Sequence, residues 1–114
     1  MSDLALEKPD QAELAEHAES AAQLLSAMAN PKRLLILCSL VTGEMAVGAL
    51  ATTVDLSQSA LSQHLAKLRA LKLVKTRRHA QTIYYSIASD EVQAVLEVLY
   101  RLYCESPDTD QGAV

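Results

Sequence analysis

The sequence predicts a mainly α-helical domain that carries one small β-hairpin. Apolar residues recur at helical spacing over most of the chain, whereas residues 73–87 alternate and are rich in β-forming side chains. The length of 114 residues suits one domain, and half of the residues are hydrophobic. A chain of this size buries a limited fraction of its surface, so association with further copies is plausible.

The N-terminal half of the chain predicts two consecutive helices. Residues 1–9 have the character of a loose tail, and a helix is expected over residues 10–29. Asn30 and Pro31 mark the start of the second helix, because Asn can cap a helix and Pro is tolerated at its first position. That helix ends near Gly43 and is apolar nearly all round, so we expect it at the centre of the fold. The apolar stripe of the first helix consists of Leu14, Ala18, Ala21, Leu25 and Met28.

A short helix, a turn and a longer helix follow. The short helix is expected over residues 47–53 and the turn at Asp55-Leu56. Ser57 has the position of an N-cap for a helix over residues 58–71. The leucines of this helix that face inward are Leu61, Leu65 and Leu68.

The C-terminal third predicts a hairpin and a final helix. The strands cover residues 73–78 and 82–87, and because the turn contains no Gly, its loop is expected to exceed two residues. Ser89 caps the last helix, which ends near Cys104 or Glu105. The domain therefore spans residues 10–105, and residues 106–114 form a polar tail that is expected to be disordered.

The charge of the chain is segregated along its length. The formal net charge is −4, yet residues 56–89 contain no Asp or Glu and hold six of the ten Lys and Arg residues. Such segregation makes one face of the fold attractive to a polyanion. The alternative is a solvated lysine-rich surface, but such surfaces usually have acids interleaved.

The order of elements indicates a winged helix-turn-helix, whose second helix enters the major groove of DNA. That helix begins with short or flexible hydrogen-bonding side chains, which can reach base edges or phosphates. Long cations on the hairpin suit phosphates or the minor groove, although charge on an edge hairpin can also serve only to prevent aggregation. The expected contacts to double-stranded DNA are Ser57, Gln58, Ser59, Ser62, Gln63, His64, Lys67, Arg69, Arg77, Arg78, His79 and Gln81.

The first and last predicted helices carry more apolar surface than a small helical core with a hairpin can cover. One recognition helix reads only a few base pairs, and two copies can bind a palindromic operator. We therefore expect a homodimer whose interface is built from the terminal helices.

The chain resembles the ArsR (ArsR/SmtB) family of transcriptional repressors over roughly residues 20–104. The resemblance rests on MANPKRLLIL, on LSQSALSQHLAKLRALKLVKTRR and on QTIYYSI. It implies a winged-helix homodimer in which the terminal helices form the interface.

The metal sites of that family are not matched. Ala46 and Gly48 stand where the thiol-rich site has cysteines, and the last helix contains no His. Its acids, Asp90, Glu91 and Glu97, would make a poor transition-metal site on their own. We expect neither a metal nor a cofactor.

Two cysteines remain, Cys38 and Cys104. Each can be a small buried hydrophobe, and Cys38 lies inside the apolar run LLILCSL. However, ANPKRLLILC and RLYC resemble the sulfur-responsive branch of the family, which contains BigR, SqrR, YgaV and HlyU. This resemblance implies that persulfides or polysulfides link Cys38 to Cys104 through a sulfur bridge, and that the protein then leaves its operator. In a reducing cytosol the resting form would be the dithiol.

Several other functions compete with this interpretation. The chain could be a metal- or general oxidant-responsive regulator, an anti-repressor of virulence genes of the HlyU kind, or a dimeric interaction module. An enzyme is not expected, because SQSALSQH has no acid nearby and resembles neither a nucleophile elbow nor a phosphate loop. No segment has the length and apolar character of a signal peptide or membrane span, so we expect a cytoplasmic protein without a membrane partner.

Overall fold

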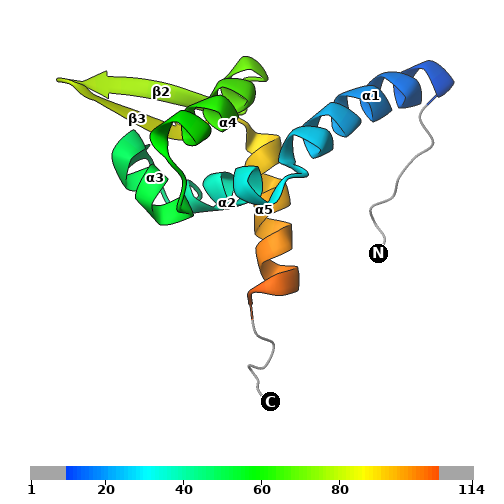
Figure 1. Cartoon of the computed structure of the whole chain (residues 1–114). Helices are drawn as coiled ribbons and strands as arrows, with labels where there is room; N and C mark the ends of the chain where they lie inside the picture. The colour runs from blue at the N-terminus through cyan, green and yellow to red at the C-terminus, as the bar shows by residue number, and fades with distance from the viewer. Residues whose placement is uncertain (1–9, 106–114) are drawn as a thin grey trace, which may run out of the picture.

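The computed structural model describes residues 10–105, which form five helices and a three-stranded antiparallel sheet (Figure 1). This architecture is a winged helix-turn-helix, as the sequence predicts. The expected tails, residues 1–9 and 106–114, lie outside the described residues. In chain order the elements are α1 (Gln11–Met28), α2 (Pro31–Ser39), β1 (Met45–Ala46), α3 (Val47–Val54), α4 (Gln58–Ala70), β2 (Val74–His79), β3 (Thr82–Ile87) and α5 (Asp90–Tyr103).

The predicted N-caps fix where three of the helices begin. The side chains of Asn30, Ser57 and Ser89 each accept a hydrogen bond from the backbone N–H three residues later, at 3.0–3.1 Å. Each bond satisfies an N–H group that has no partner within its helix. The predictions at the starts of α2, α4 and α5 are therefore confirmed.

The predicted end of α2 is wrong by about four residues. The helix stops at Ser39, and residues 40–43 form a turn that includes Gly43 at a φ of 147°. This backbone conformation favours Gly, so Gly43 marks the end of the turn and not the end of the helix.

The sheet joins the hairpin to the helical body. Its strand order is β1-β3-β2, and β1 pairs with β3 through Met45–Tyr85 and Ala46–Tyr84. Strand β1 is not predicted by the sequence, because two residues are too short for an alternating pattern. The consequence is that the wing is anchored directly before α3 as well as after α4.

The hairpin turn also differs from the prediction. His79 pairs with Thr82, so the loop contains only Ala80 and Gln81. Ala80 adopts a φ of 57°, in the left-handed region that residues with a Cβ enter at an energetic cost. Ala80 adopts this conformation despite the cost, so the absence of Gly does not require a longer loop.

The core lies between α2, α3, α4, the wing and the first half of α5. Leu61, Leu65 and Leu68 of α4 are at most 1% exposed, as predicted. The expectation that α2 lies at the centre of the fold holds for one of its faces, since Ile36 and Leu37 are buried while Leu35 is 43% exposed. Only one face of α2 therefore contributes to the core.

The terminal helices extend away from this core. Figure 1 shows α1 and the C-terminal half of α5 projecting from the body in different directions. In the predicted stripe of α1, Leu14 and Leu25 are 50% and 55% exposed, and only Met28 is buried. Within residues 10–105, no helix is long and apolar enough to cross a membrane.

The strained turn makes a prediction about stability. Replacing Ala80 with Gly removes the steric cost of the left-handed conformation, so we expect the free energy of unfolding to rise by about 0.5–1 kcal/mol. Chemical denaturation monitored by circular dichroism measures this change. Ala66→Gly in α4 is the matched control and should lower the free energy of unfolding by about 1 kcal/mol. Equal losses in both variants would show that Ala80 is not strained.

Candidate nucleic-acid interface and thiol pair

The position of α4 is set by its neighbours in the helix-turn-helix. Asp55 ends α3 in a left-handed conformation at a φ of 57°, and the Leu56 N–H donates to the Ala51 carbonyl at 3.0 Å. The Lys32 ammonium group of α2 donates to the Val54 carbonyl at 2.7 Å. These contacts fasten the end of α3 to α2 and fix the turn from which α4 begins.

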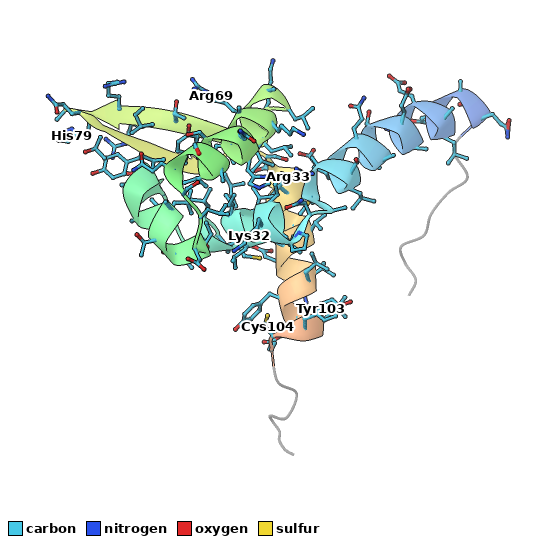
Figure 2. All side chains as sticks on the ribbon, viewed as in Figure 1. Lys32, Arg33, Arg69, His79, Tyr103 and Cys104 are labelled. Carbon is cyan, nitrogen blue, oxygen red and sulfur yellow. The ribbon has the colours of Figure 1, made fainter. Side chains whose placement is uncertain are left out.

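The face of α4 opposite its buried leucines is polar and exposed. Gln58, Ser59, Ser62 and Gln63 all lie on the surface, beside the exposed cap Ser57. Figure 2 shows Arg69 at the end of α4 and His79 at the tip of the wing, both away from the C-terminal end of α5. The other predicted contact residues that are exposed are Lys67, Arg77, Arg78 and Gln81.

His64 is placed differently from the other predicted contacts. Its side chain is half-buried at the flank of α4. This partial burial, and then the neighbouring Arg33 and Lys67 cations, lower the pKa of His64. The shift favours the neutral imidazole, which can both donate and accept a hydrogen bond.

Arg33 is a residue that the sequence analysis did not single out. Its Nε donates to the Ala27 carbonyl at 2.6 Å, which ties α2 to the end of α1. Its charge also reaches His64 on α4. Arg33, His64 and Lys67 thus form a small basic cluster between α2 and α4, which sequence spacing alone did not reveal.

Arg77 is not a free cation in the wing. Its guanidinium donates to the Glu44 carboxylate through Nε at 3.1 Å and Nη2 at 2.6 Å. Its guanidinium carbon also lies 4.7 Å from the centroid of the Tyr84 ring. By sequence alone Arg77 belongs with the other wing cations as an expected DNA contact, and nothing in the local pattern indicates its pairing with Glu44, 33 positions earlier.

The two thiols are free, and both are exposed in the chain. The interpretation of Cys38 as a core residue is therefore wrong, because it lies on the face of α2 that the core leaves uncovered. Partial desolvation, and then the nearby Cys104, raise the pKa of the Cys38 thiol. Cys104 ends α5, where its backbone N–H donates to the Tyr100 carbonyl at 2.8 Å (Figure 2).

A pocket of about 540 Å³ lies between the C-terminal ends of α2 and α5. Cys38 forms part of its wall, and the residues around it combine apolar and charged side chains. They are Val41, Thr42, Leu96, Glu97, Tyr100, Arg101 and Glu105. A small molecule that enters this pocket would meet the Cys38 thiol directly.

Comparison with known proteins shows the family of this chain. The family model described as "Bacterial regulatory protein, arsR family" matches residues 30–76, which run from the α2 cap into β2. The nodulation protein NolR of Rhizobium meliloti is 68% identical over 93 residues, which cover 82% of this chain and 76% of NolR. The chain belongs to the ArsR family.

Other ArsR-family relatives share most of the chain. The transcriptional activator HlyU of Vibrio cholerae is 52% identical over 94 residues, 82% of this chain and 87% of HlyU. The biofilm growth-associated repressor of Agrobacterium fabrum is 40% identical over 89 residues, which cover 78% of this chain and 76% of that repressor. The chain is therefore a transcriptional regulator of the ArsR family.

Solved structures agree with this fold. Reduced HlyU from Vibrio cholerae superposes with a TM-score of 0.79 at 53% identity, covering 82% of this chain and 98% of HlyU. The homodimeric winged helix-turn-helix DNA-binding domain of Mb0332 from Mycobacterium bovis gives a TM-score of 0.73 at 28% identity, covering 96% of this chain and 100% of that domain. The likeness to the Mb0332 domain agrees with the winged helix-turn-helix described above.

The basic cluster of this ArsR-family chain predicts a titration behaviour. Replacing Lys67 with Met removes a like charge from His64, so the protonated imidazole becomes less unfavourable and the pKa of His64 rises. An NMR titration of the imidazole signals measures the change. Lys75→Met, on the wing, is the control and should leave this pKa unaltered. Equal shifts in both variants, or none, would contradict the cluster.

Proposed function

We propose that this regulator is a sequence-specific repressor that binds a palindromic operator as a homodimer in the cytoplasm. Reactive sulfur species link Cys38 to Cys104, and the dimer then leaves the DNA. One observation carries the sensing part of the proposal: two free, exposed thiols lie on α2 and α5, and α2 is bonded to the helix-turn-helix. This supports a connection between the thiols and DNA binding.

The surface of α4 supports readout of base sequence. Gln can form paired hydrogen bonds with adenine, and Ser discriminates less between bases, so Gln58 and Gln63 are proposed as the main readers. Lys67, Arg69 and Arg78 are proposed to bind phosphates, which position the protein without reading sequence. The polar side chains proposed to complete the interface are Ser57, Ser59, Ser62, His64, His79 and Gln81.

The exposed apolar surface of the terminal helices supports the homodimer. On α5, Leu102 and Tyr103 are 69% and 82% exposed. Together with Leu14 and Leu25 of α1, they leave apolar side chains in water at both ends of the chain. A twofold interface of these helices would cover them, and the related domain of Mb0332 is homodimeric.

Repression is the simplest outcome of operator binding, and the Agrobacterium fabrum relative is called a repressor. HlyU, at 52% identity, is called an activator. A second candidate function is therefore that the bound dimer displaces another repressor and so activates transcription. Both functions use the same DNA surface, and only the promoter context separates them.

The proposed sensing reaction balances with a persulfide as oxidant. A thiolate attacks the terminal sulfur of one persulfide and becomes a protein persulfide, releasing one thiol. A second persulfide oxidises this group and the other protein thiol to a trisulfide, releasing one thiol and hydrogen sulfide. Two persulfides thus convert the dithiol to a trisulfide, two thiols and hydrogen sulfide.

The DNA surface is tested with a labelled duplex that the protein selects from a random library. Gln63→Ala should weaken binding by about 1–3 kcal/mol and relax the preference at one base position. Arg69→Gln should weaken binding to all sequences and reduce the salt dependence by about one phosphate contact. Fluorescence anisotropy over a series of salt concentrations measures both.

Lys72→Asn is the control for these variants. Lys72 belongs to the same acid-free stretch but borders the pocket between α1 and the start of α5. Asn also tolerates its left-handed φ of 62°. The proposed interface would be wrong if Lys72→Asn changed the salt dependence as much as Arg69→Gln.

The thiol pair is tested by Cys38→Ser and Cys104→Ser. Each variant should bind the selected duplex as the wild type does and should not be released by an organic persulfide, because no bridge can form. Mass spectrometry of the treated wild type should show a Cys38–Cys104 link with one added sulfur. Persulfide-dependent release that survives in both single variants would refute the sensor, and release by a metal ion alone would favour a metal-responsive regulator.

A further inference from the structure

Glu44 brings a negative charge onto the basic wing. The stretch from residue 56 to residue 89 contains no acid, but the fold places Glu44 beside Arg77 of β2. Within residues 10–105, this is the only ion pair that joins a Lys or Arg to a carboxylate. The wing therefore contains one carboxylate among its cations, although the stretch of sequence that forms β2 and β3 has none.

The sheet explains how the two side chains meet. Ala46 of β1 pairs with Tyr84 of β3, and Tyr84 pairs in turn with Arg77 of β2. Arg77 therefore crosses the sheet over the Tyr84 ring and reaches Glu44, which directly precedes β1. Backbone pairing holds the strands in this register, so the ion pair is not needed to form the sheet.

The ion pair is open to solvent. The side chains of Arg77 and Glu44 are 54% and 39% exposed. The hydrogen bond with Arg77 lowers the pKa of Glu44 and so favours its ionised carboxylate. Exposed ion pairs add little to folding stability, so a structural role alone does not account for this acid on the wing.

A carboxylate and a phosphate compete for the same guanidinium donors. The planar fork of an arginine binds either group through two parallel hydrogen bonds. Glu44 occupies such a fork through both of its carboxylate oxygens. A DNA phosphate that approached the wing would need the donors that Glu44 now holds.

We propose that Glu44 competes with the DNA backbone for Arg77 and so reduces the affinity of this regulator for DNA. The inference rests on the proposed DNA binding. In the free protein Arg77 binds Glu44, and on DNA it exchanges this partner for a phosphate. Glu44 is thus a determinant of affinity that never touches the DNA.

The test compares Glu44→Ala, Arg77→Ala and the double variant on the selected duplex and on a random-sequence duplex. Glu44→Ala should bind both duplexes more tightly, because Arg77 binds its phosphate without first losing a partner. The salt dependence should stay close to that of the wild type, since Arg77 neutralises the same phosphate in both proteins. The double variant should bind as Arg77→Ala does. Glu44→Gln, which keeps the side-chain shape, should change affinity in the same direction.

Asp55→Asn controls for the loss of any negative charge near the DNA. Asp55 lies in the α3–α4 turn without an ion pair among the described residues, and Asn tolerates its left-handed backbone. Its effect should be the same with Arg77 present or replaced by Ala. Weaker DNA binding by Glu44→Ala than by the wild type would overturn the proposal. So would tighter DNA binding by the double variant than by Arg77→Ala alone. No binding by the wild type would instead refute the proposed function itself.

Discussion

The burial of three leucines on one face of α4 is the constraint on which the other features of this molecule depend. Leu61, Leu65 and Leu68 are nearly inaccessible, and α4 packs on α3 and β2 through this face. Because the helix has 3.6 residues per turn, burying these positions turns the Gln and Ser side chains outward. Under the proposed function, the surface that reads DNA is therefore a consequence of core packing, and Ser57 also contributes to the fold as the cap of α4.

Helix α2 contacts both the helix-turn-helix and the pocket beside Cys38. Near its start, where Figure 2 labels Lys32 and Arg33, Lys32 holds the end of α3 and the charge of Arg33 acts on His64 of α4. Near its end, Cys38 borders the pocket that α2 shares with α5. Under the proposed function, a bridge from Cys38 to Cys104 would pull on α2 and α5 together. Such a movement would change how the recognition helices of a dimer fit two half-sites, without altering any side chain that touches DNA.

Features set by short stretches of sequence could be predicted, whereas features set by distant contacts could not. Asn30, Ser57 and Ser89 cap helices through bonds to residues three positions away, so local sequence contains the whole interaction. The Glu44–Arg77 pair depends on the register of a sheet whose first strand has two residues. Likewise, the exposure of Cys38 depends on which face of α2 the core covers, and an apolar sequence does not specify that face.

The central claim is that this ArsR-family chain reads DNA as a twofold dimer through α4. Hydroxyl-radical footprinting of the wild-type protein on a duplex selected from a random library tests it most directly. The account predicts two protected half-sites, related as an inverted repeat, whose centres lie about one helical turn apart or a multiple of it. One continuous protection without an inverted repeat, or no selected sequence at all, would contradict the claim.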